Sequence, residues 1–190
     1  MTLTAREMLY SLYGAYRLAR LDKDGVVYFD STPEGAMRSF HAAVLVLPAY
    51  VVLTLLRQWD QLGDLSLVRF LMVEGIAYVI SWTAYPLLMF HVSGLLDRAD
   101  HFYTFLCAYN WSSVIQMAVY LPVVLLAETG LLPPALGEGL VMITTLLILV
   151  YQWFVVRTTL DVNPGVAAGL VLVDVTVAVT ITSMADGMLQ

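Results

Sequence analysis

The sequence is poor in charge and in cysteine, and each shortage excludes a class of protein. Only 13% of its 190 residues are charged, and a soluble domain of this size needs more charge than that on its surface. The single cysteine, Cys107, allows neither an intramolecular disulfide nor a cysteine metal site, and we expect it to pack in an apolar stretch. The sequence has no basic run that could neutralise phosphates, so nucleic acid is not an expected partner.

Motifs for catalysis, metals and cofactors are also missing. The sequence contains neither a G-x-S-x-G elbow nor a glycine-rich phosphate loop. Its three histidines, His41, His91 and His101, do not have the H-x-x-x-H spacing of a zinc site. We therefore expect a protein that is not an enzyme and that uses no metal or cofactor.

Apolar residues are abundant instead. They make up 60% of the chain, and the mean hydropathy is +0.80. A membrane-spanning helix needs about 20 predominantly apolar residues. Five such runs predict an all-α, polytopic membrane helix bundle in one domain over residues 36–190, with spans at approximately 37–56, 68–96, 103–126, 140–156 and 164–184. The N-terminus lacks the compact apolar stretch and cleavage site of a secretory signal, so we expect the first run to remain a membrane helix.

The positions of Lys and Arg predict the direction of these spans. Five of the nine precede or begin the first span, and Arg98 and Arg157 belong to connections on the same side. The opposite side has only Arg57 and Arg69, and its other loop is expected to carry Glu128 and Glu138. By the positive-inside rule the N-terminus lies in the cytoplasm and the C-terminus in the periplasm, with the chain in a bacterial inner membrane.

Residues 1–35 form a distinct N-terminal segment in this interpretation. Thr4 and Glu7 have the T-x-x-E spacing of a capping box, which predicts a helix from there to about Arg20. This helix is amphipathic, and two interpretations stay open. It either lies in the headgroup plane with its cations near anionic lipid, or packs on the cytoplasmic ends of the bundle. Its apolar side consists of Met8, Leu9, Leu12, Ala15, Tyr16 and Ala19.

Polar side chains inside the spans are the candidates for function, because burying them in a membrane is costly. Asp174 lies near the middle of the fifth span and Glu74 lies in the second, and neither is expected to have a Lys or Arg at a comparable depth. Asn110 and Gln116 of the third span are expected on one broad face toward Asp174. This group is either a proton or substrate path or a set of structural hydrogen bonds between helices.

Two further groups could mediate contacts with partners. Gly165 and Gly169 form a GxxxG in the fifth span, on the side opposite Asp174, where small residues allow another helix to approach closely. At the cytoplasmic surface, the connection after the second span carries four charged or titratable residues. That cluster is a docking site, a pH-responsive patch or a solvated loop, and it consists of Asp97, Arg98, Asp100 and His101.

The stretch WFVVRTTLDVNPGVAAGLVLVD, residues 153–174, resembles the bacterial members of the Yip1-like superfamily. There an aromatic-rich fourth helix ends in Arg, crosses a tight turn and starts a fifth helix of small residues. The resemblance covers nearly the whole chain, and it implies a cytoplasmic N-terminal segment followed by five closely spaced membrane helices. This sequence has neither the D-L-x-G-P nor the G-Y type motif of the eukaryotic members, so binding of small GTPases does not carry over.

Two functions are compatible with these features. The first is a non-catalytic membrane protein that serves as an accessory or scaffold subunit, or organises the membrane as a Yip1-like protein. The alternative is a small oligomeric transporter or channel with Asp174 in its path. In both cases the expected partners are the lipid bilayer and either another protein or further copies of the chain.

Overall fold

The computed structural model describes residues 3–59 and 66–189, and helices make up nearly all of this part of the chain. Five segments are long and apolar enough to cross a membrane: Pro33–Arg57, Leu67–Leu95, Ala99–Glu128, Pro134–Thr159 and Pro164–Leu189. Most of their large apolar side chains point outward; Leu71, Leu147 and Leu172, for example, are each more than half exposed. So much exposed apolar surface indicates contact with lipid. The chain is thus a membrane-embedded helical protein.

The elements follow one another with short connections. In chain order they are α1 (Ala5–Ala19), the 3-10 helix η1 (Lys23–Tyr28), α2 (Pro33–Ser39), α3 (His41–Arg57), α4 (Leu67–Leu95), the 3-10 turn η3 (Ala99–His101), α5 (Phe102–Glu128), α6 (Pro134–Thr159) and α7 (Pro164–Leu189).

Local chemistry sets several of the helix ends. Thr32 caps α2 by accepting a hydrogen bond from the Gly35 amide at 3.0 Å, and Pro33 follows at the first helical position. Pro134 occupies the corresponding position in α6, which therefore begins several residues before the predicted 140. Glu138, predicted in a loop, lies inside this helix, and Glu128 is the last residue of α5. A carboxylate in an end turn reaches water, so it does not end the helix.

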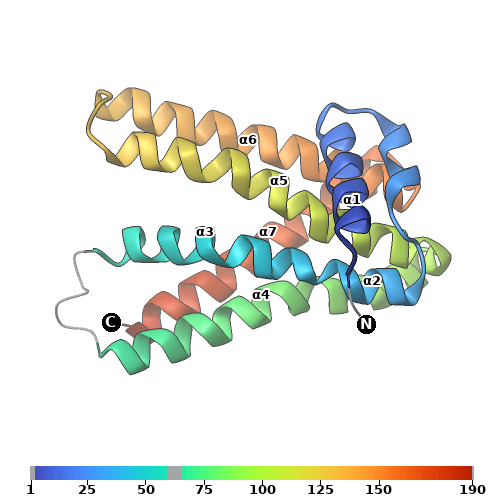
Figure 1. Ribbon diagram of the computed structural model, residues 1–190, viewed down its shortest axis with the longest axis horizontal. Helices are drawn as coiled ribbons and strands as arrows, with labels where there is room; N and C mark the ends of the chain where they lie inside the picture. Colours follow the sequence, from blue (N-terminus) through green and yellow to red (C-terminus); the bar gives the residue numbers. More distant parts are fainter. Residues whose placement is uncertain (1–2, 60–65, 190) are drawn as a thin grey trace.

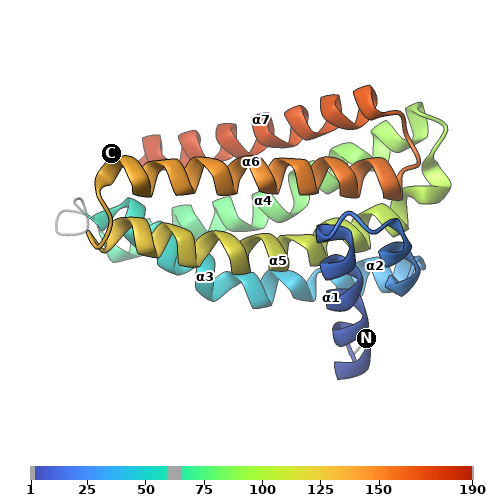
Figure 2. The ribbon, with the colours of Figure 1, turned by 90° about the horizontal axis from the view of Figure 1, so that it is seen from above.

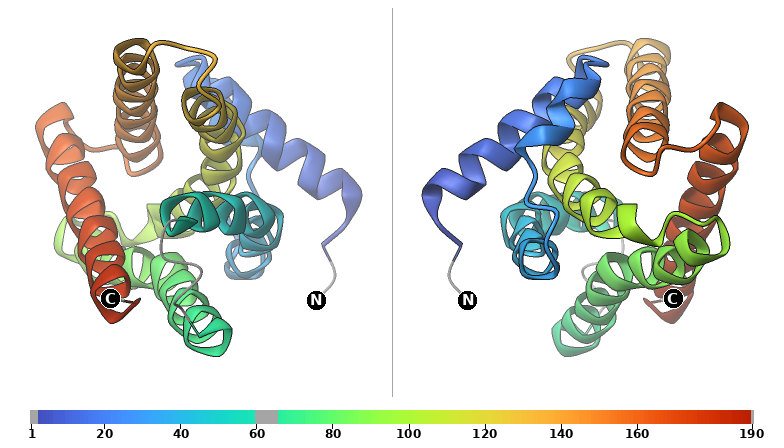
Figure 3. Two further views of the ribbon diagram at one scale, coloured as in Figure 1. Left: turned by 90° about the vertical axis from the view of Figure 1, so that its left-hand side faces the viewer. Right: turned by 90° about the vertical axis from the view of Figure 1, so that its right-hand side faces the viewer.

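The five long helices run along one direction of the molecule (Figures 1 and 2). The strongest packing is between α5 and α6, and α5 also packs on α3, while α7 packs on both α4 and α6. Seen end-on, the helices are arranged around a common centre in the order α3, α5, α6, α7 and α4 (Figure 3). The backbones of α3 and α4 pack less closely than these pairs, and side chains join the two helices; the Tyr78 hydroxyl of α4, for example, donates to the Ala43 carbonyl oxygen of α3.

The two ends of the bundle differ. At one end, called here the α1 end, α1 lies across the long helices, and the connections α4–α5 and α6–α7 lie there too (Figures 1 and 2). The opposite end carries the α5–α6 connection and the C-terminus (Figure 1). Fully buried side chains gather toward the α1 end, among them Leu18, Tyr85, Phe105, Trp111 and Leu160. The helices are therefore held firmly at the α1 end and pack more openly toward the other.

The helix α1 begins with the predicted capping box. The Thr4 hydroxyl accepts from the Glu7 amide at 3.2 Å, and the Thr4 amide donates to the Glu7 carboxylate at 3.0 Å. The side of α1 that contains Ala15 and Leu18 is fully buried against the bundle. Leu9, from the predicted apolar side, is 64% exposed. The predicted apolar side of α1 is thus partly buried in the protein, as at Ala15, and partly exposed, as at Leu9.

Two glycines allow α1 and η1 to cross closely. A Cβ atom on Gly14 would lie 2.8 Å from the carbonyl oxygen of Gly25, and one on Gly25 would lie 2.7 Å from the carbonyl oxygen of Gly14. Any side chain at either position would push the backbones apart. The N-terminal segment therefore packs on itself as well as on the bundle.

Candidate functional site

Asp174 lies on the side of α7 that faces α5 and α6. Its carboxylate accepts a hydrogen bond from the Tyr109 hydroxyl at 3.0 Å and another from the Gln152 amide at 3.3 Å. These contacts join three helices through one acidic side chain. Hydrogen bonds between helices were one of the two interpretations of this group that the sequence left open.

The hydrogen bonds continue from Gln152 to Gln116, whose amide donates to the Gln152 side-chain oxygen at 2.7 Å. Gln116 also lines a cavity of about 300 Å³ between α3, α5 and α6. A chain of polar groups thus leads from Asp174 to this cavity. Its walls are Val46, Ser113, Gln116, Met117, Tyr120, Thr145 and Ile148. Sequence reasoning missed Gln152, although a glutamine inside a predicted span was a signal that could have found it.

Asn110 does not join this chain, and the expectation that it faces Asp174 is wrong. Its amide donates to the Ser39 hydroxyl at 2.8 Å, and the side chain is fully buried against α2. Consecutive helical residues point about 100° apart, so Asn110 turns away from the face of Tyr109 and Gln116. The side-chain oxygen Oδ1 of Asn110 has no hydrogen-bond partner within the described residues.

Glu74 belongs to a separate ion cluster near the opposite end. The Arg57 guanidinium lies 2.9 Å from one of its oxygens, and the Tyr50 hydroxyl donates to the other at 2.6 Å. The same guanidinium lies 3.2 Å from Asp186 on α7, which also accepts from Gln58 at 2.8 Å. The prediction that Glu74 has no cation nearby is therefore wrong, because Arg57 reaches back from the end of α3.

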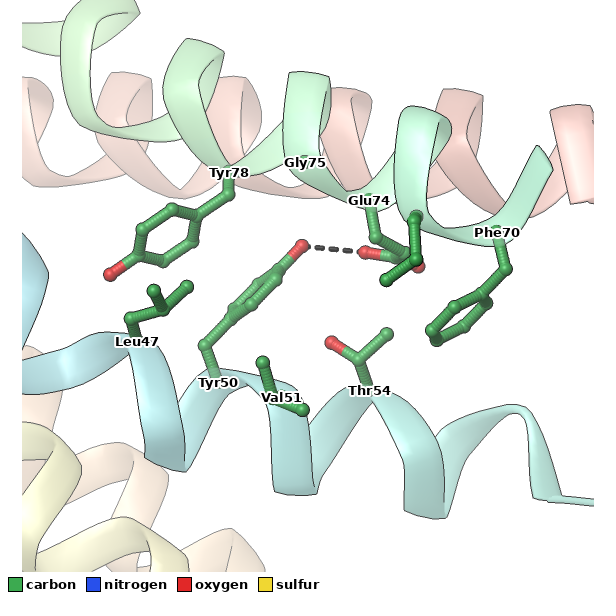
Figure 4. A pocket seen from close by; sticks show the side chains of 9 residues that line it. Leu47, Tyr50, Val51, Thr54, Phe70, Glu74, Gly75 and Tyr78 are labelled. Carbon is green, nitrogen blue, oxygen red and sulfur yellow. Dashed lines mark hydrogen bonds between the residues drawn. The ribbon is translucent and has the colours of Figure 1, made fainter. Parts of the chain in front are cut away.

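Beside this cluster, a crevice of about 170 Å³ separates α3 from α4. Figure 4 shows Tyr50 extending from α3 toward Glu74 on α4. The rings of Tyr50 and Tyr78 lie against each other, with centroids 4.6 Å apart. The remaining lining is mostly apolar and consists of Leu47, Val51, Thr54, Phe70, Leu71 and Gly75.

The predicted small-residue face of α7 is exposed. A Cβ atom on Gly169 would meet nothing within 4 Å, and one on Gly165 would meet only the side chain of Asn163. Thr176 and Thr180 are exposed on the same side, and their hydroxyls donate to carbonyl oxygens of α7 itself. In the described part of the chain, no other helix packs closely against these small residues.

The four predicted docking residues lie at the α1 end. Arg98 donates to the Asp161 carbonyl oxygen at 3.0 Å and thereby ties the α4–α5 connection to the α6–α7 connection. His101 contacts Asp100 at 2.9 Å. Asp97 has a left-handed backbone with φ of 56°, which marks a tight turn after α4. Arg98 therefore has a contact within the fold, and its side chain is only partly exposed.

Comparisons of the chain with family models, curated proteins and solved structures find no match. The Yip1-like resemblance therefore stays a prediction. The candidate functional sites are Asp174 with its hydrogen-bond partners, the Glu74 cluster and the small-residue face of α7.

Proposed function

We propose that the chain is a non-catalytic integral membrane protein that serves as an accessory or scaffold subunit and binds a protein partner or a second copy through α7. The observation that carries the proposal is the unoccupied face with Gly165 and Gly169. Close backbone approach at small residues is a common basis for helix association in membranes. The other side of α7 is already committed to Asp174 and its partners on α5 and α6.

The composition of this face favours a helix over lipid as its neighbour. Lipid contacts do not select for glycine, which costs about 1 kcal/mol relative to alanine inside a helix. Two glycines one turn apart give a shallow groove, and Thr176 and Thr180 continue it along α7. A partner helix seated there would bury all four positions.

We also propose that the protein is Yip1-like and lies in a bacterial inner membrane with the α1 end in the cytoplasm. Seven of the nine Lys and Arg residues lie in the segments that meet at the α1 end, which agrees with the positive-inside rule. In this orientation α1 lies parallel to the membrane plane (Figure 2). Its exposed Leu9 and Tyr16 would then contact headgroups and acyl chains, while Arg6 and Arg20 would attract anionic lipid.

A Gly169→Leu variant tests the α7 interface. The chain is purified from native membranes in mild detergent, and its complexes are sized and identified by mass spectrometry. We expect the original chain to elute with a stoichiometric partner or as a homo-oligomer, and Gly169→Leu to lose that complex. The matched control is Gly139→Leu on α6, where an added Cβ also meets nothing within 4 Å. Elution of the original chain as a monomer would contradict the proposal.

The second candidate function is a small oligomeric transporter or channel. The hydrogen-bonded chain from Asp174 through Gln152 and Gln116 to the cavity favours it, because polar chains inside a membrane also form proton and substrate paths. Asp174→Asn discriminates between the two functions in reconstituted vesicles. Loss of a proton or ion flux in Asp174→Asn with an intact fold would support transport. Equal flux through the original chain and Asp174→Asn would exclude Asp174 from the path.

A further inference from the structure

We propose that the cavity between α3, α5 and α6 binds the ring of a lipid-soluble quinone, whose carbonyl oxygens accept hydrogen bonds from Gln116 and Tyr120. The depth of the cavity, its uncharged lining and the hydrogen-bonding capacity of Gln116 carry this inference. It goes beyond the accessory role proposed above and uses a surface other than the small-residue face of α7.

The cavity lies near the middle of the membrane-spanning part of α5. At a rise of about 1.5 Å per residue, Gln116 is about 21 Å from the first residue of this helix and about 18 Å from the last. The hydrocarbon core of a bilayer is about 30 Å thick, so headgroups and bulk water lie well away from Gln116. The lining runs from the buried Val46 to the exposed Thr145. A ligand therefore enters this cavity from the membrane.

Gln116 has hydrogen-bonding capacity beyond its contact with Gln152. Asp174 accepts from the Gln152 amide, which leaves the Gln152 oxygen to accept from Gln116. In the described part of the chain, this bond commits one of the two N–H groups of Gln116. The second N–H group and the side-chain oxygen remain for the cavity, which Tyr120 lines one helical turn further along α5. Polar groups in hydrocarbon are costly without partners, so these side chains select a ligand that forms hydrogen bonds.

The available donors favour a ligand with acceptor oxygens. The hydroxyls of Ser113 and Thr145 donate to carbonyl oxygens of their own helices. Gln116 and Tyr120 are therefore the donors left for a ligand among the described lining residues. None of the seven is charged, so the cavity has no partner for an ionic ligand. The ester carbonyls of phospholipids lie at the membrane interface rather than at this depth, which leaves a neutral carbonyl compound that dissolves in hydrocarbon.

The shape and apolar lining of the cavity suit a ring. Its volume of about 300 Å³ is at the lower limit of small-molecule sites, which combine apolar walls with a few polar groups. Met117 contributes a flexible thioether, and such groups make favourable contacts with unsaturated rings. A quinone combines a flat ring, two carbonyl oxygens and no charge.

Thr145 provides the test of the cavity. Thr145→Leu places a larger apolar side chain in the lining without breaking a bond between helices, because the Thr145 hydroxyl bonds to its own helix. Thr83→Leu is the matched control, since Thr83 is also exposed and its hydroxyl also bonds to its own helix, α4. Gln116→Leu removes a proposed donor. Native mass spectrometry in mild detergent measures binding of a benzoquinone with a decyl tail, and decylbenzene is the probe without carbonyls.

We expect one quinone per chain and about twenty-fold weaker binding of decylbenzene, which cannot accept the two hydrogen bonds. Thr145→Leu should weaken quinone binding about ten-fold by overfilling the cavity, and Thr83→Leu should leave it unchanged. Gln116→Leu should weaken quinone about five-fold and leave decylbenzene unchanged.

Equal binding of the two probes to the original chain would overturn the proposal. The absence of bound quinone would overturn it too, and so would an equal loss in Thr145→Leu and Thr83→Leu. Gly169→Leu should bind quinone as the original chain does even where it loses its protein complex. The quinone site and the α7 interface can therefore each fail alone.

Discussion

The guanidinium of Arg57, at the end of α3, lies 2.9 Å from the Glu74 carboxylate of α4. Through its Nε atom it also lies 3.2 Å from Asp186 of α7. One cation therefore joins three helices at the end where the bundle packs most openly. The ion cluster therefore joins the helices at this end, as the buried aromatic side chains join them at the α1 end.

This arrangement predicts a non-additive effect on stability. Arg57→Gln should lower the free energy of unfolding by about 2 kcal/mol, because it leaves the largely buried Glu74 carboxylate without its cation. Glu74→Gln should cost less, since an amide still accepts from Tyr50. The double variant should be more stable than the sum of the two changes implies. Thermal unfolding in detergent measures this, and strictly additive effects would show that the pair contributes nothing.

Asp174 is predicted to stabilise the packing of α7. Asp174→Leu leaves the Tyr109 hydroxyl and the Gln152 amide without their acceptor, so the free energy of unfolding should fall by about 1–2 kcal/mol. Asp174→Asn keeps one oxygen for Tyr109 and should cost about half as much. Melting temperatures of the two variants in the same detergent test the order. If Asp174→Leu is as stable as the original chain, these hydrogen bonds have no structural role.

The N-terminal segment should loosen at acid pH. The backbone amide and hydroxyl of Thr4 lower the pKa of Glu7, and so does Arg38, which lies 2.9 Å away. Arg17 lowers the pKa of Asp22 by a 2.6 Å hydrogen bond. A carboxylate whose pKa is lower in the folded state than in the unfolded state stabilises the fold, and this stabilisation is complete when the pH is above the unfolded pKa. The ordinary values are 4.5 for Glu7 and 3.8 for Asp22, and the stabilisation is lost as the pH falls through the folded pKa.

A spin label at Leu9→Cys reports this loosening, because Leu9 is exposed and the native Cys107 is buried. Its mobility should rise as the pH falls from about 6 to about 3. A Glu7→Gln, Asp22→Asn background should show the mobile state at both pH values. Constant mobility in the original chain across this range would contradict the assignment.

Gly14 is predicted to be far less tolerant of substitution than Gly75. Gly14→Ala places a Cβ atom 2.8 Å from the Gly25 carbonyl oxygen and should separate α1 from η1. Gly75→Ala meets no atom within 4 Å and should be neutral or stabilising, since alanine is the better helix former. Limited proteolysis of the N-terminal segment distinguishes the two variants. Equal resistance would mean that the crossing can open without cost.

The sequence predicted the features that depend on local pattern. Apolar runs indicated five membrane-spanning helices, and the Thr4 and Glu7 spacing indicated the cap of α1. The side-chain partners depend on how distant helices meet. Arg57 and Glu74 belong to different helices, so no local pattern showed that they pair. The contact of Asn110 with Ser39 likewise depends on where α2 crosses α5. Gly14 and Gly25 show their role only once α1 and η1 are seen to cross.

Photo-crosslinking in native membranes tests the central claim, a protein partner on the small-residue face of α7, most directly. A photoreactive residue replaces Leu172, which is 68% exposed and lies on the Gly169 side of α7. The control site is Leu147 of α6, which is 64% exposed. We predict one dominant protein adduct at position 172, identified by mass spectrometry and lost in the Gly169→Leu background, and no protein adduct at position 147. Lipid adducts alone at both positions would contradict the account.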